Sequence, residues 1–296
     1  MVVTVLAWAS AFIVIRGTGE FISGGALALG RLVVGAVLLA VIALVGGTWV
    51  RPTTREWLQV IGFGVLWFGG YNVALNIAEQ TLDAGTTAMI VGIGPVLMAL
   101  GAGIFLGEGI PKWLAIGAGV ALLGVILIGI GSGGTRFGDG SGVVWGLVAA
   151  VAYTVGVLLQ KPALRRLPAA QVTWLGCVIG MVACFPFALD LVREVQNAPV
   201  GAIIGVVYLG AVPTALAFST WAYALSRMPA GQLGITTYLV PPLVIVLGLL
   251  VFGEVPAVLA VAGGAVCLVG VALARRRPRM TPTALVVTDP GKTVAE

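Results

Sequence analysis

Histidine is absent from the 296 residues of the sequence, and cysteine is scarce. Histidine is the commonest metal ligand in proteins and the side chain that most readily titrates near neutral pH. The three cysteines, Cys177, Cys184 and Cys267, match no zinc or disulfide spacing, so we interpret them as small residues of a core. These absences predict that the protein uses neither a metal ion nor a cofactor.

Charged residues are also scarce. Only 9% of the residues are charged, against about 25% in a soluble domain, and 59% are hydrophobic. A chain this apolar cannot cover a water-facing surface, so lipid is the solvent that suits most of it. The 44 glycines agree with this, since small residues let helices approach closely inside a membrane. The net charge of +5 comes from scattered basic residues and does not indicate nucleic-acid binding.

Apolar runs long enough to cross a bilayer recur along the chain. They fall at residues 2–16, 24–45, 57–77, 86–107, 113–131, 142–161, 170–190, 200–225, 232–252 and 256–274. The first run lacks the basic start and cleavage site of a signal peptide, so we expect a permanent helix. Lysine and arginine are concentrated in alternate loops, and this bias predicts that both termini lie in the cytoplasm. Glu79 and Asp83 are then expected in an outer loop.

The second half of the sequence repeats the first at an offset of 146 residues. Pro95 then lies beside Pro241 and Glu108 beside Glu254, and both residue types are rare in apolar segments. Each copy holds five apolar runs, and an odd number forces the second copy to cross the membrane in the opposite sense. We therefore predict an all-α integral membrane fold of ten transmembrane helices, built as two inverted five-helix repeats. The predicted units are residues 1–131, residues 132–274 and a disordered basic cytoplasmic tail at 275–296.

Several short motifs point to a known family. They are Trp8-Ala9-Ser10-Ala11-Phe12, then Arg31, then Pro95 with Leu106-Gly107-Glu108, and finally Pro241 with Phe252-Gly253-Glu254. With them, nearly all of residues 1–274 resembles the EamA-like transporters of the drug/metabolite transporter superfamily. The resemblance implies export of amino acids, metabolites or drugs, by exchange or with protons as the coupling ion. It also implies a midplane cavity between the helices, in which the substrate binds.

Three charged residues are candidates for roles in transport. Arg31 lies well inside a predicted helix, where a charge is costly and therefore suggests a function. It either contacts substrate or extends to the outer headgroups. Glu108 and Glu254 each precede a predicted helix, where a carboxylate satisfies free amide groups. Such capping competes with a role for these two residues in proton coupling.

Prolines, polar and aromatic residues inside the predicted helices are further candidates for the substrate pathway. Pro95 and Pro241 each remove a backbone hydrogen bond in mid-helix, which suits a hinge, a cavity wall or a tolerated kink. Asn72 and Asn76 share one helix face and would line a cavity or bond a neighbouring helix. The remaining candidates are Trp8, Ser10, Tyr71, Tyr153, Trp221, Tyr223 and Tyr238.

Together these features predict a secondary transporter of a bacterial inner membrane that exports amino acids or similar small metabolites by alternating access. The sequence has no G-x-x-x-x-G-K-[ST] motif for ATP, so a gradient or exchange must supply the energy. An efflux carrier for drugs or other metabolites is one alternative, and a non-transporting membrane scaffold or receptor is another. An enzyme is not expected, because the acidic residues are scattered and histidine is absent.

Overall fold

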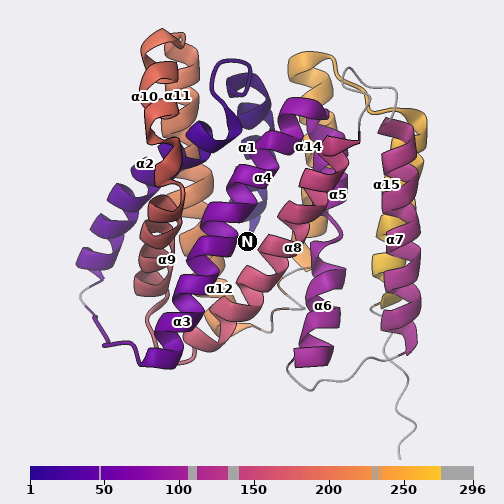
Figure 1. Ribbon diagram of the computed structural model, residues 1–296. Helices are drawn as coiled ribbons and strands as arrows, with labels where there is room; N and C mark the ends of the chain where they lie inside the picture. The colour runs from indigo at the N-terminus through magenta and orange to yellow at the C-terminus, as the bar shows by residue number, and fades with distance from the viewer. Residues whose placement is uncertain are drawn as a thin grey trace, which may run out of the picture.

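The chain is folded as a bundle of helices (Figure 1). The computed structural model describes residues 1–46, 48–105, 112–132, 140–228, 230, 233 and 235–274. Within those residues there is no β-strand. Glu108 and the tail predicted at 275–296 lie outside the described residues.

Among the described residues, the first half of the chain contains eight helical elements, one of them a π-helix. They are α1 (Val2–Thr18), α2 (Gly24–Val45), α3 (Thr54–Phe63), the π-helix η1 (Gly64–Tyr71), α4 (Asn72–Thr81), α5 (Ala84–Val91), α6 (Gly94–Phe105) and α7 (Lys112–Ser132). The elements α3, η1 and α4 follow one another without a gap and form a single long span.

The second half has a comparable order of elements. They are α8 (Ser141–Ala163), α9 (Ala169–Ala183), the 3₁₀ turn η2 (Phe185–Phe187), α10 (Ala188–Asn197), α11 (Val200–Leu209), the π-helix η3 (Gly210–Leu216), α12 (Ala217–Arg227), the 3₁₀ turn η4 (Ile235–Leu239), α14 (Val240–Phe252) and α15 (Val258–Ala274). Here α11, η3 and α12 form the continuous long span.

Local sequence signals set several of these helix ends. Thr53 and Glu56 form a capping box before α3, in which the Glu56 carboxylate accepts the Thr53 amide at 2.7 Å. Asp83 caps α5 by accepting the Thr86 amide at 2.8 Å. Gly253 ends α14 with a φ of 65°, a conformation that glycine adopts without the strain of a Cβ atom.

The lengths and surfaces of the helices are those of a membrane protein. Among the described residues, four helical segments are long and apolar enough to cross a bilayer, and the bent pair α9–α10 makes a fifth. Five shorter apolar helices accompany them. Large apolar side chains such as Val45 and Val258 are more than four-fifths exposed, which suits a lipid-facing surface. The prediction of an all-helical, multi-pass membrane protein is confirmed.

Two spans are interrupted at the prolines that the sequence analysis placed in mid-helix. The run predicted at 86–107 is two helices, because α5 ends at Val91 and α6 begins at Gly94. Pro95 therefore lies in the first turn of α6, and Pro241 lies in the first turn of α14. A first turn tolerates proline because the missing N–H would have no helical partner there. At these points the regular α-helical hydrogen bonding is interrupted, by the turn between α5 and α6 and by the 3₁₀ turn η4 before α14.

Other features differ from the predicted runs. The run at 170–190 bends by 54° after Ala183, where Phe185, Pro186 and Phe187 form η2. The run predicted at 57–77 continues to Thr81, so Glu79 lies in α4 and is buried rather than in an outer loop. The two π-helices were also not predicted, because their apolar sequences look the same as those of ordinary helices.

Small residues bring the helices together closely. At one edge of the bundle α7 and α15 lie side by side, on the right in Figure 1. A Cβ atom on Gly263 of α15 would come within 2.6 Å of the Gly124 carbonyl oxygen of α7, so this approach requires glycine. The three cysteines are buried and free. In the centre of the bundle the largest buried side chains are aromatic, and several of these border a pocket.

Candidate functional site

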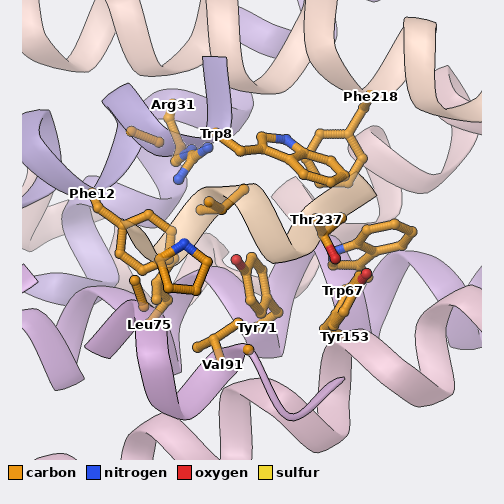
Figure 2. A pocket seen from close by; sticks show the side chains of 15 residues that line it. Trp8, Phe12, Arg31, Trp67, Tyr71, Leu75, Val91, Tyr153, Phe218 and Thr237 are labelled. Atoms are coloured by element: carbon orange, nitrogen blue, oxygen red, sulfur yellow. The ribbon is translucent and has the colours of Figure 1, made fainter. Parts of the chain in front are cut away.

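A pocket opens in the middle of the bundle, between helices from both halves of the chain (Figure 2). Its empty volume, including the part open to solvent, is about 630 Å³. The lining side chains are mostly apolar or aromatic. They come from α1, α2, η1, α4, α5, α8, α12, η4 and α14.

One wall of the pocket is a cluster of aromatic rings. We call Trp8, Trp67, Tyr71, Tyr153 and Phe218 the aromatic wall. Trp67 of η1 lies at its centre, with ring centroids 5.0 Å from those of Tyr153 and Phe218 and 6.3 Å from that of Trp8. These tilted geometries are favourable for aromatic pairs, so the rings hold one another in place. The wall is therefore a rigid, apolar surface.

Among the described residues that line the pocket, one is charged. Arg31 of α2 is only 3% exposed, and its Nε donates a hydrogen bond to Thr214 Oγ1 at 3.1 Å. Thr214 lies in η3, where its own hydroxyl donates to the Leu209 carbonyl at 2.8 Å. Figure 2 shows the guanidinium group directed towards the space between Trp8 and Phe12.

The remaining nitrogens of Arg31, Nη1 and Nη2, form the free side of the guanidinium fork. Among the described residues the bond to Thr214 is the one hydrogen bond of this side chain. A fork of two parallel N–H groups matches the two oxygens of a carboxylate. Among the described residues the Arg31 side chain forms no ion pair, and it is one of the side chains that line the pocket.

The structure brings together five of the residues singled out from the sequence. Trp8, Arg31, Tyr71, Tyr153 and Pro241 all line the pocket. Trp8 is also fixed by a bond from its Nε1 to the Pro213 carbonyl of η3 at 3.3 Å. The pocket thus gathers residues that lie far apart in the sequence.

Other predicted residues lie elsewhere. Ser10 bonds the Tyr208 hydroxyl at 2.7 Å, on the side of α1 that faces α11. Trp221 is fully buried behind Trp8, with ring centroids 5.1 Å apart. Tyr223 is 58% exposed and packs under Arg227. Pro95 lies in α6 and does not line the pocket, and the side chain of Tyr238 is outside what the structure describes.

The two asparagines of α4 are buried but make structural bonds. Asn72 Nδ2 donates to the Phe68 carbonyl at 2.7 Å, a backbone group of the π-helix η1. Asn76 Nδ2 donates to the Gly24 carbonyl at 2.9 Å and so ties α4 to the start of α2. Neither lines the pocket.

An ion pair lies near one end of the bundle. Arg16 of α1 binds Glu254, with 2.9 Å between Nη2 and Oε1, and its Nη1 donates to the Glu79 backbone carbonyl at 3.4 Å. These contacts tie α1 to α4 and to the segment after α14. In the described part of the chain, Glu254 therefore bonds Arg16 rather than capping α15.

Three aromatic residues of the pocket, Phe12, Trp67 and Phe218, were not among the site residues predicted from the sequence. Phe12 was noted only as part of a family motif. Trp67 and Tyr71 are four residues apart, so their shared helix face was a usable signal. Phe218 lies in an apolar run and gave no signal of its own.

The sequence is similar to those of known transporters. A sequence profile of the EamA-like transporter family matches residues 1–130 and 140–276. A "Probable terminal-alkyne amino-acid exporter" of Streptantibioticus cattleyicolor is 36% identical over 277 residues, 94% of this chain and 92% of the relative. The uncharacterized transporter YdfC of Bacillus subtilis is 33% identical over 270 residues, 89% of this chain and 86% of that protein.

Two more distant proteins are also similar to this chain. The aromatic amino acid exporter YddG of Ancylobacter novellus is 30% identical over 203 residues, 67% of this chain and 68% of that protein. One solved crystal structure is similar with a TM-score of 0.63 and 21% identity, covering 92% of this chain and 94% of the other, which supports the fold alone. The chain therefore belongs to the EamA-like transporter family, and it is a transporter rather than an enzyme.

Proposed function

We propose that this transporter exports amino acids with apolar side chains, by alternating access and without ATP. The observation that carries the proposal is Arg31, a buried guanidinium whose free nitrogens face a pocket lined with aromatic rings. A buried cation of this kind needs an anionic partner, because an unpaired charge in an apolar site is costly. A substrate carboxylate supplies that partner.

The apolar and aromatic side chains of the pocket suit the side chain and the ammonium group of an amino acid. An apolar or aromatic side chain packs against the aromatic wall around Trp67. The ammonium group is attracted to the face of an aromatic ring such as that of Trp8 or Tyr71, close to the bound carboxylate. Phosphorylated substrates fit less well, because Arg31 is the one basic residue among the lining residues.

The relatives support the same substrate class. Two of them carry names that describe amino-acid exporters, one for terminal-alkyne and one for aromatic amino acids. Terminal alkynes and aromatic rings are both apolar groups, which is what the aromatic wall would select.

For the architecture, we propose ten spans in two inverted units, residues 1–131 and 132–274. The four long spans, the bent pair and the five shorter apolar helices make ten segments among the described residues. Several elements of the first half also have a counterpart in the second half that begins 146 residues later, which is the offset of the sequence repeat. The paired starts are Thr54 and Val200, Gly64 and Gly210, Gly94 and Val240, and Lys112 and Val258.

In the proposed arrangement the pocket lies between the two units, as alternating access requires. The helix interruptions after Val91 and before Val240 both lie at the pocket, where Gly92 and Pro241 are lining residues. They are natural points for the helices to bend as the units rock. The basic loops favour an orientation with both termini in the cytoplasm, and the bacterial relatives favour a bacterial plasma membrane.

Counterflow in proteoliposomes tests this function. Vesicles loaded with unlabelled phenylalanine or leucine should accumulate the same labelled amino acid from outside, with saturation. Phenylalanine should compete for this uptake, and phenethylamine, which has no carboxylate for Arg31, should compete at least about tenfold more weakly.

The alternatives give different results. Equal competition by the amine and the amino acid would contradict the role of Arg31 and favour a carrier of drugs or other metabolites. Absence of counterflow for every amino acid tested would remove the amino-acid proposal. A scaffold or receptor would bind without any accumulation that depends on the internal pool.

A further inference from the structure

A buried acid of α4 has no role in the pocket. Glu79 is 1% exposed, and neither of its carboxyl oxygens has a hydrogen-bond partner among the described residues. The adjacent Gln80 cannot help, because its Nε2 already donates to the Gly19 and Ile22 carbonyls. An ionised carboxylate in such a place is costly, whereas a protonated carboxyl group carries no charge.

The groups around Glu79 come from each helix that packs at this end. Arg16 of α1, Arg31 of α2, Asp83 at the start of α5 and Glu254 after α14 are the charged groups near enough to interact with it. Tyr71 of η1 also interacts with it. The first ten residues of α8, numbers 141–150, contain no titratable side chain. Glu79 thus shares its surroundings with two arginines and two other acids.

Of these, Arg16 also forms a hydrogen bond with the backbone of Glu79. Its Nη1 already donates to the backbone carbonyl of Glu79, while its Nε and Nη2 hold Glu254 Oε1. The other oxygen of Glu254, Oε2, is buried and has no partner among the described residues. One guanidinium therefore interacts electrostatically with two carboxyl groups and forms an ion pair with only one of them, Glu254.

We propose that Glu79 is a proton-binding site that couples transport to protons, and that Arg16 moves between Glu254 and Glu79 as this proton is lost and regained. This inference rests on the proposed function. When the O–H bond of Glu79 breaks, the proton leaves to water and the electron pair stays on the carboxylate. Arg16 then turns to neutralise it and releases Glu254, which loosens the contact between α1 and the end of α14. Reprotonation from the other side of the membrane restores the ion pair.

The test compares two uptake assays in the same proteoliposomes. One is counterflow, which needs no net proton movement. The other is accumulation driven by a pH gradient, acid inside, in which outward proton movement draws labelled amino acid in. A gradient of about one pH unit can support about tenfold accumulation by one-for-one exchange.

Glu79→Gln keeps the shape of the side chain and removes the titrating proton. The ratio of gradient-driven accumulation to counterflow should fall about tenfold in this variant. Glu20→Gln is the matched control, because Glu20 is exposed in the turn between α1 and α2, and it should keep the wild-type ratio. A wild-type ratio in Glu79→Gln would overturn the inference.

The same assays separate this inference from the proposed function. Wild-type counterflow without a response to a pH gradient of either sign would leave the amino-acid carrier intact and refute proton binding. Absence of wild-type counterflow would remove both proposals.

A second variant decides the case in which Glu79→Gln fails to fold. Glu254→Gln frees Arg16 to stabilise ionised Glu79, so driven uptake should be half-maximal at a pH about one unit lower than in the wild type. An unchanged pH of half-maximal uptake in Glu254→Gln would contradict the movement of Arg16.

Discussion

The two π-helices begin 146 residues apart, at Gly64 and Gly210, but they contribute differently to the pocket. The first, η1, presents Trp67 and Tyr71 directly to the pocket. The second, η3, lines none of it and holds other residues in position: Thr214 binds Arg31, and the Pro213 carbonyl binds Trp8. The first π-helix thus contributes side chains to the pocket wall, and the second holds two of the pocket residues in position.

Both π-helices expose backbone carbonyls to side chains, because the wider turn disturbs the regular helical hydrogen bonds. The Asn72 side chain donates a hydrogen bond to the Phe68 carbonyl of η1, and the Thr214 hydroxyl donates one to the Leu209 carbonyl just before η3. In the second half, the same threonine also accepts the bond from Arg31. The comparison teaches that the same backbone irregularity can present side chains to a pocket in one place and hold pocket residues in position in another.

Removing the charge of Arg31, which Thr214 holds in position, should reduce transport more than any other change. Arg31→Gln should lower kcat/KM for amino acids at least about 30-fold, because the substrate carboxylate loses its buried partner. Arg31→Lys should restore only part of this, since lysine lacks the planar fork. Arg193→Gln, on the exposed face of α10, is the control and should transport normally. Full transport by Arg31→Lys would show that the fork is not used.

Disturbing the positioning π-helix should have a smaller effect that is the same for every substrate. Thr214→Val removes the oxygen that orients Arg31 and should raise KM about three- to tenfold, as expected for one lost hydrogen bond. Because the carboxylate is common to all amino acids, phenylalanine and leucine should be affected alike. Thr214→Ser should behave as the wild type; a defect as large as that of Thr214→Val would argue against positioning.

Disturbing the presenting π-helix should instead change selectivity. Trp67→Leu removes a ring from the aromatic wall and should lower the preference for phenylalanine over leucine about threefold, from the strength of one aromatic contact. Trp67 is buried, so the melting temperature of the variant must be measured alongside the uptake. Tyr223→Phe, at an exposed site, should leave the preference unchanged. Equal losses for both amino acids in Trp67→Leu would erase the distinction between the two π-helices.

Much of the fold could be predicted because hydrophobic length is a direct physical signal. The run expected at 24–45 coincides with α2, and the other helices start within a few residues of their runs. Pro95 and Pro241 indicated in advance that the helices are interrupted near Val91 and Val240. The π-helices were not predicted, because widening a helix changes hydrogen bonds and leaves the apolar pattern unchanged.

The site was less accessible from the sequence. Arg31 stood out because a charge in an apolar run is rare, but its partner Thr214 lies 183 residues away along the chain. Trp67 was inconspicuous because an aromatic residue is ordinary in an apolar helix. Glu79 was assigned to a loop because polarity alone cannot distinguish a helix end that stays buried. Burial and pairing depend on tertiary contacts that no single segment encodes.

The enclosure of all three cysteines affects how the protein withstands oxidants. Oxidation of a thiol to a sulfenic acid or a disulfide requires that the reagent reach the sulfur. Cys177, Cys184 and Cys267 are each at most 4% exposed, so peroxide dissolved in water meets none of them directly. Transport should therefore survive oxidising conditions that inactivate carriers with accessible thiols.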